Sequence, residues 1–144
     1  MVQQYRNIYQ IARKCTGFTQ EKASELMNIS VDSLRAYEGD KRVPLDNIVI
    51  KMIEIYYAQY LAYQHMKTKT QIGEEFLPEL QFKFLAEAVL AFLDEYEDLE
   101  KIKKLMIRIS RDGQIDDNEK DDWEKVMKEI NDVIAAGMVL SFTK

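Results

Sequence analysis

The sequence predicts an all-α protein. Its long segments repeat apolar residues at intervals of three or four, the period of an amphipathic helix, and no stretch of four or more residues alternates convincingly as a strand. Only two prolines and five glycines interrupt the 144 residues, and the 47% of hydrophobic residues can fill the core of one ordinary domain or two small ones.

Four helical stripes in the first half of the chain are separated by residues that stop or cap helices. Gly17 is a natural stop for the first helix, and Thr19 and Ser30 can cap the second and third. Asn28, between them, tolerates the left-handed conformation of a tight turn. A bend is expected near Tyr57, after the fourth. The apolar positions are Tyr5, Ile8, Ile11, Ala12 and Cys15; Ala23, Leu26 and Met27; Leu34 and Tyr37; and Leu45, Ile48, Val49, Met52, Ile53 and Tyr56.

Three further helices are predicted in the second half. They follow a polar stretch, "KTKTQIGEEFLP", which contains Gly73 and Pro78 and is assigned to a linker. The organisation predicted is therefore a domain over 1–67, a linker over 68–79 and a helical domain over 80–144. The later stripes are Leu85, Ala88, Val89, Phe92, Leu93 and Tyr96; Leu99, Ile102, Leu105, Met106 and Ile109; and Trp123, Val126, Met127, Ile130, Val133 and Ile134.

The charge is divided unevenly between the two halves. Residues 1–70 contain 10 Lys and Arg against 7 Asp and Glu, a net charge of +3, and residues 71–144 contain 10 against 18, a net charge of −8. Together they give the overall −5. This asymmetry indicates two parts with different functions, of which only the first suits a polyanionic partner. We expect the acidic part to lie away from such a partner, beyond the Debye length of about 8 Å.

The remaining general features point to the cytoplasm. Cys15 is the only cysteine, and its place on an apolar stripe predicts a small buried thiol in a reducing compartment. The opening "MVQQYRNIYQIARK" is interrupted by charge and is not expected to be a signal peptide. No apolar run approaches the roughly 18 residues of a membrane span, so no membrane partner is expected.

Residues 20–37 have the spacing of a helix-turn-helix, in which two helices cross steeply through a short turn. With Gln20 as the first position, the fifth should be small and is Ser24, and the ninth favours glycine and is Asn28. The remaining constrained positions should be apolar. They are Met27, Ile29, Leu34 and Tyr37. Two capped helices with such a turn also occur in helical bundles that bind no DNA.

The stretch "FTQEKASELMNISVDSLRAYEGDKRVP", residues 18–44, resembles the helix-turn-helix of the Xre family of lambda-repressor-like regulators. The shared features are the "TQ" opening, the small residue, the turn, the "YE" pair and the basic "KR-P" loop, and the resemblance spans residues 5–56. Continued by "QYLAYQHM", the stretch is also similar to a subgroup from phages and mobile elements of Gram-positive bacteria. The resemblance implies an N-terminal lambda-repressor-like bundle followed by a small helical domain for dimerisation or regulation.

The resemblance also implies a DNA-binding surface. The glutamine that opens the motif would bond a phosphate, the start of the recognition helix would contact base edges, an arginine would follow one turn later, and the basic loop would lie near the backbone. These positions are Gln20, Ser30, Val31, Asp32, Ser33, Arg35, Lys41 and Arg42. Tyr37 and Glu38 would brace the motif from within.

Two residues depart from the pattern of the family. Asp40 stands where the family continues directly into "KR", and so lengthens the loop. Asp32 places a carboxylate beside the groove, where it would repel phosphate but could accept a hydrogen bond from a cytosine amino group. Lys51 and Arg6 are expected to be ordinary exposed charges.

The stretch "RISRDGQIDDNE" echoes the second half of a calcium-binding EF-hand loop. With Gly113 at position six, Glu119 falls at position twelve, but positions one and three are Arg108 and Ser110, and a guanidinium cannot coordinate a cation. We expect instead that the helix stops at Gly113, that Ile115 lies in the core and that Asp116 caps the next helix.

No residue pair suggests catalysis, because His65, the only histidine, is not expected near Cys15 and the carboxylates lie in solvated charge runs. We therefore expect no enzyme, metal or cofactor. The expected function is a sequence-specific transcriptional regulator, such as a repressor, that binds a pseudo-palindromic operator in double-stranded DNA as a homodimer, with an effector left open. The alternative is an adaptor whose helix-turn-helix is structural and whose acidic half binds a basic protein; Lys41 and Arg42 favour DNA.

Overall fold

The computed structural model describes residues 7–143, which contain helices and no strand. The all-α prediction is therefore confirmed. The chain divides into two compact units, Met1–Leu77 and Pro78–Lys144, and the boundary falls within the segment assigned to a linker. Tyr5 and Arg6 lie outside the described residues. No helix in the described range has the length and apolar character needed to cross a membrane.

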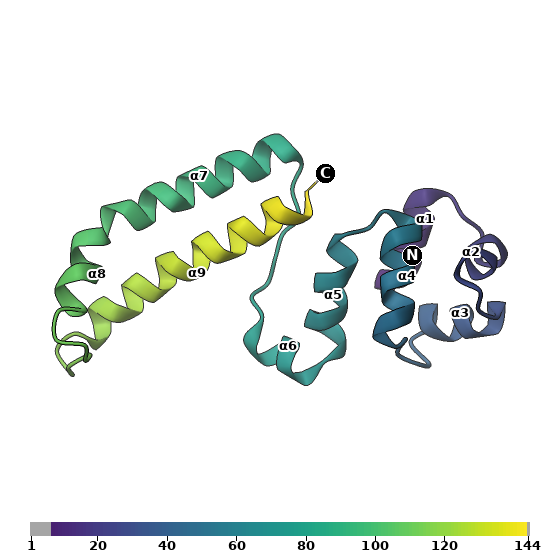
Figure 1. The fold of residues 1–144 in the computed structure, drawn as a ribbon, viewed down its shortest axis with the longest axis horizontal. Coiled ribbons are helices and arrows are strands. Elements are labelled where there is room, and N and C mark those ends of the chain that lie inside the picture. The colour runs from purple at the N-terminus through teal and green to yellow at the C-terminus, as the bar shows by residue number, and fades with distance from the viewer. Residues whose placement is uncertain (1–6, 144) are drawn as a thin grey trace, which may run out of the picture. The chain divides into compact units, whose positions relative to one another are not determined.

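The N-terminal unit is a small helical bundle around one core. Its helices are α1 (Ile8–Thr16), α2 (Gln20–Met27), α3 (Val31–Glu38), α4 (Asp46–Tyr56), α5 (Tyr60–Lys69) and α6 (Gln71–Phe76) (Figure 1). Met27, Leu34, Met52 and Leu61 are fully buried in the core, so each of α2 to α5 contributes to it. The chain bends at Tyr57, which has a left-handed backbone, as the sequence predicts.

The face that α1 buries differs from the predicted stripe. Tyr9, Ala12 and Arg13 are its buried residues, whereas Ile11 is 40% exposed and Cys15 is exposed. The prediction of a buried thiol is therefore wrong. The physical reason is that Arg13 forms an ion pair inside the bundle, and this rotates the apolar stripe of α1 partly out of the core.

The segment assigned to a linker is largely helical. It contains the end of α5 and all of α6, because Thr70 caps α6 by accepting a hydrogen bond from the backbone N–H of Gly73. A Cβ atom at Gly73 would lie 1.8 Å from the carbonyl oxygen of Met66, so only glycine permits this close approach. The polar composition of the segment gave no sign of that contact.

The C-terminal unit is built on a helical hairpin. Its helices are α7 (Leu85–Lys101), α8 (Lys103–Ile109) and α9 (Lys120–Phe142), and α7 and α9 lie side by side and antiparallel (Figure 1). Gly137 lies against the ring of Phe92 where the two helices pack.

The connection between α8 and α9 differs in part from the sequence prediction. Helix α8 ends at Ile109, and Gly113 adopts a left-handed conformation in the turn that follows. The carboxylate of Glu119 accepts a hydrogen bond from the backbone N–H of Asp116, but α9 begins only at Lys120 and its cap lacks a side-chain hydrogen bond. The prediction that Ile115 lies in the core is wrong: it is 42% exposed, because it lies in the turn that closes the hairpin between α8 and α9.

Candidate nucleic-acid interface

Helices α2 and α3 are joined by the short turn 28–30, and each is capped as predicted. Thr19 accepts a hydrogen bond from the backbone N–H of Lys22, and Ser30 accepts one from that of Ser33, both at 3.1 Å. Asn28 has the left-handed conformation (φ 55°, ψ 51°), which lets the chain reverse directly after α2. These contacts fix where α3 begins.

Helix α2 is fixed against the rest of the bundle by a small buried residue and by a hydrogen bond to its C-terminal end. Ser24, at the position expected to be small, is buried, and its hydroxyl donates to the carbonyl of Glu21 at 2.9 Å. Lys51 of α4 donates to the carbonyl of Met27 at 3.0 Å and so satisfies the end of α2. The expectation that Lys51 is an ordinary exposed charge is therefore wrong.

A buried ion pair braces the motif from within. Arg13 of α1 donates to both carboxylate oxygens of Glu38, at 2.6 and 2.9 Å, and also to the carbonyl of Phe18 at 2.6 Å. The two charged side chains are only 8% and 2% exposed, and the hydrogen bond to Glu38 raises the pKa of Arg13. Glu38 therefore has the bracing role expected of it. Arg13 is not among the residues predicted from the sequence, although its position four residues after Tyr9 places it on the same helical face.

Gln20 is oriented inward as well as toward the surface. Its amide nitrogen donates to Glu38 at 2.8 Å, and its amide oxygen accepts from Arg35 at 3.3 Å. The side chain expected at a phosphate therefore links the buried ion pair to the exposed arginine of α3.

Helix α3 and its N-cap Ser30 contain five of the eight residues expected to contact DNA. Ser30, Asp32 and Arg35 are exposed, whereas Val31 and Ser33 are half-buried. The guanidinium of Arg35 lies 3.3 Å from the carboxylate of Asp32 and 3.5 Å from that of Glu21. Its side chain is 55% exposed, so both ion pairs are accessible to water and to competing anions.

The loop after α3 presents its two cations outward. Lys41 and Arg42 are exposed, and their backbone N–H groups both donate to the carbonyl of Ala36, at 3.0 and 3.2 Å. The guanidinium of Arg42 lies over the ring of Tyr37, 4.9 Å from its centroid, which orients it. This loop therefore holds two cations close to the end of α3.

Asp40, the residue that lengthens this loop, has a structural role. It adopts a left-handed conformation (φ 54°) and accepts hydrogen bonds from Asn7 at 2.8 Å and from Lys69 at 2.7 Å. The hydrogen bond from Lys69 lowers the pKa of the Asp40 carboxyl. The additional residue thus attaches the loop to α1 and α5.

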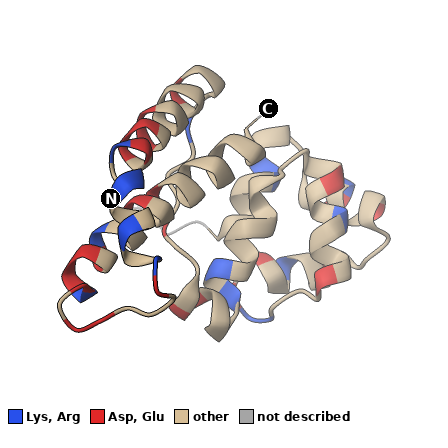
Figure 2. Ribbon diagram, turned by 60° about the vertical axis from the view of Figure 1, so that its left-hand side comes forward, with Lys and Arg blue, Asp and Glu red and all other residues tan. Residues whose placement is uncertain are grey.

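The charges of this surface are mixed. Within α2 and α3 the exposed charged residues are Glu21, Lys22, Glu25, Asp32 and Arg35. Figure 2 shows basic and acidic residues interspersed along the ribbon in the described part of the chain. The surface lacks the continuous basic stripe that a strong non-specific DNA binder would present.

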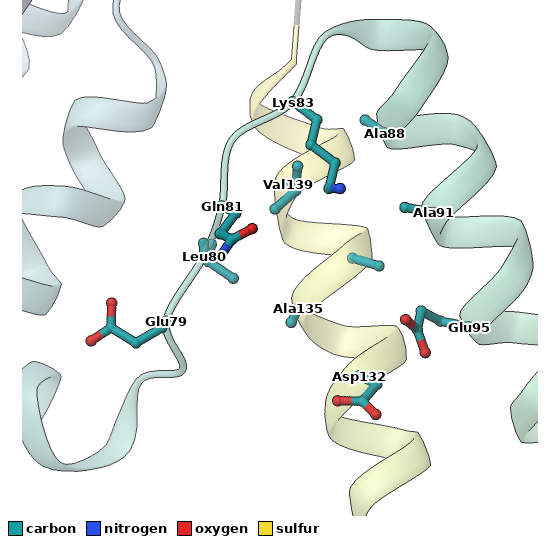
Figure 3. A pocket seen from close by; sticks show the side chains of 11 residues that line it. Glu79, Leu80, Gln81, Lys83, Ala88, Ala91, Glu95, Asp132, Ala135 and Val139 are labelled. Carbon is teal, nitrogen blue, oxygen red and sulfur yellow. The ribbon is translucent and has the colours of Figure 1, made fainter.

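A cavity of about 310 Å³ lies in the C-terminal unit, between α7, α9 and the segment 79–83 (Figure 3). Ala88 and Ala91 line its α7 side, and Lys83 reaches toward it from the segment. Glu95 and Asp132 also line it, and oxygen atoms of these two residues and of Glu129 lie within 4.8 Å of one another. Burial, and then the neighbouring Asp132, raises the pKa of Glu95. Three carboxylates supply about half of the six to eight oxygens that Ca²⁺ takes, and they do not define a metal site.

Two side chains at ligand positions of the EF-hand-like stretch form hydrogen bonds within the protein. Arg108, at the first loop position, donates to Asp122 at 2.8 Å. The carboxylate of Asp112 accepts a hydrogen bond from the backbone N–H of Gln114 at 3.1 Å, as in an ordinary turn. These contacts agree with the interpretation of this stretch as a helix connection.

No family model, no curated protein and no solved structure matches the chain.

Proposed function

We propose that this protein is a sequence-specific DNA-binding transcriptional regulator of the cytoplasm, related to the Xre family. The observation that carries the proposal is the N-terminal half of α3, Val31–Arg35. Ser30 caps it, Asp32 and Arg35 are exposed on it, and a fully buried leucine, Leu34, anchors it from behind. A helix presented in this way can place its N-terminal side chains on base edges in the major groove.

The cations near α3 suit contacts with the phosphate backbone. Lys41 and Arg42 extend from the loop that follows the helix, and Lys22 is exposed on α2. Since only these few cations accompany Arg35, one copy binds weakly, and we propose that two copies bind a pseudo-palindromic operator. The same few cations keep non-specific binding low, which favours discrimination between sequences.

A second candidate function, a protein-interaction adaptor, is favoured by the pairing of Arg35. Its guanidinium already has Asp32 and Glu21 as partners, and the amide of Gln20 is engaged with Glu38. On DNA these partners must be replaced by a base or a phosphate. The exposed ion pairs cost little to break, about 0–1 kcal/mol, and therefore DNA binding remains the first proposal.

The proposal predicts that Arg35→Ala weakens binding to the operator by about 1–3 kcal/mol, the value of one good contact between an arginine and a guanine. The measurement is fluorescence anisotropy with full-length protein and labelled DNA. Circular dichroism should remain unchanged, because the Arg35 side chain is exposed.

The matched control for this prediction is Arg111→Ala. Arg111 is an exposed arginine in the turn after α8, so its removal changes the net charge equally but leaves α3 intact. Equal losses for both variants would show a general charge effect. Undiminished operator binding by a folded Arg35→Ala protein would exclude Arg35 from the interface.

A further inference from the structure

The hairpin of the C-terminal unit has an exposed apolar face, formed by Leu85, Val89, Leu93 and Tyr96 of α7 and Ile130 and Ile134 of α9. The α7 residues are separated by four, four and three positions, so they follow one side of the helix. Ile130 is half-buried and the other five side chains are 37–55% exposed. The apolar face thus follows one side of α7 over four residues and is extended by two residues of α9.

Both stripes lie away from the cavity. On α7, Ala88, Ala91 and Glu95 line the cavity (Figure 3). Val89 and Tyr96 of the apolar face directly follow Ala88 and Glu95 in the sequence. On α9, Ala135 and Val139 line the cavity, and Ile134 of the apolar face directly precedes Ala135 in the sequence. Because consecutive residues are about 100° apart, the apolar stripes lie a third to a half of a turn from the cavity side.

The core of this unit is too small for a hairpin of such length. Among the described residues of the unit, the buried hydrophobic side chains are Ala88, Ile109, Val126 and Val139. The segment 79–83 covers one side of the hairpin, but the apolar face has no second layer within the unit. Stable domains bury each apolar face against another layer, so this face requires a partner.

We propose that the partner is a second copy of this chain, whose apolar face packs on the first to form a four-helix bundle of two α7 and two α9 helices. In a two-fold dimer the same patch occurs on both subunits, and an apolar stripe without charges is complementary to itself. The role of this dimer in DNA binding rests on the proposed function, whereas the association of the two copies does not depend on it.

The charge of the unit supports this choice of partner. Residues 78–144 contain 16 acidic and 10 basic residues, yet the six residues of the apolar face include no charge. A basic protein partner would be attracted to the charged flanks of the hairpin and would leave the apolar stripe uncovered. The apolar face of a second copy of this chain removes this surface from water without breaking ion pairs.

The expected contact is at the small end of biological interfaces, for which about 1,000 Å² is the lower bound. Five roughly half-exposed side chains on each copy contribute to it, together with half-buried neighbours such as Phe92 and Met127.

The test measures the mass of the full-length protein by light scattering during size-exclusion chromatography, in the absence of DNA. The wild type should elute with twice the chain mass of 16.9 kDa. Leu93→Glu, which places a charge at the centre of the face, should raise the dissociation constant of the dimer by about tenfold or more and give the mass of one chain at low concentration. The matched control is Ile72→Glu, since Ile72 is 74% exposed on α6 in the N-terminal unit, and this variant should remain a dimer.

Helix content by circular dichroism separates loss of pairing from loss of folding. Should Leu93→Glu unfold, the milder Leu93→Ala is measured, and it should shift the same equilibrium in the same direction. A monomeric wild type, or a folded Leu93→Glu protein that stays dimeric, would overturn the proposal. The mass measurement contains no DNA, so its result is independent of a separate selection of bound DNA sequences. A dimeric protein that selects no DNA sequence would refute only the proposed function. A monomeric protein that selects one would refute only the pairing.

Discussion

Replacing Glu38 with alanine is expected to lower the free energy of unfolding of the N-terminal unit by about 3–5 kcal/mol. The carboxylate accepts two hydrogen bonds from Arg13 and one from Gln20, and its side chain is 2% exposed. Without this carboxylate, the positive charge of Arg13 stays buried without a counterion, and such a charge strongly destabilises the folded protein. Urea denaturation followed by circular dichroism measures the loss.

The control for this prediction is a variant that removes both charges, Arg13→Met with Glu38→Leu. Buried ion pairs often contribute little net stability relative to apolar residues of similar size, so the double variant should be much closer to the wild type than Glu38→Ala alone. A double variant as unstable as the single one would mean that the shape of the ion pair, and not the unpaired charge, determines the loss.

Leu34→Ala is expected to destabilise the same unit by about 2–5 kcal/mol. Leu34 is fully buried and is the contact through which α3 is attached to the core. Its removal creates a cavity behind the exposed residues of α3, so loss of stability should be accompanied by loss of operator binding. Thermal denaturation and anisotropy on the same samples measure the two effects.

Leu26→Ala provides the matched comparison for Leu34→Ala. Leu26 lies in the neighbouring helix α2 but is 45% exposed, and its truncation should change stability by no more than about 0.5 kcal/mol. Similar losses for the two variants would contradict the description of α3 as anchored through Leu34.

Local patterns in the sequence predicted most of the helices, the caps at Thr19 and Ser30 and the left-handed turn at Asn28, because these depend on residues within a few positions of each other. The orientation of α1 could not be predicted in this way. It depends on Arg13 meeting Glu38, 25 positions later in the chain, and a charged residue on a stripe ordinarily indicates a solvated side. The helix α6 depends similarly on a contact between Gly73 and the main chain of Met66.

The candidate site was predictable as a set of positions but not as a set of contacts. The spacing within residues 20–37 identified the side chains that face inward, and the resemblance implied which side chains of α3 would contact DNA; of these, Asp32 and Arg35 are exposed. Nothing in the spacing indicated that Arg35 would lie between Asp32 and Glu21, or that Gln20 would connect it to Glu38. These contacts result from the packing of α2 on α3. They determine how readily Arg35 and Gln20 can break their contacts within the protein and form contacts with a nucleic acid.

The most direct test of DNA recognition is selection of bound sequences from a random pool of double-stranded DNA by the full-length protein at moderate salt. The proposed function predicts enrichment of a consensus with two inverted half-sites, centred about one helical turn, 10–10.5 base pairs, apart. It also predicts that Arg35→Ala relaxes the preference at one position of each half-site. Recovery of no consensus by a folded protein would contradict DNA recognition and would favour the adaptor.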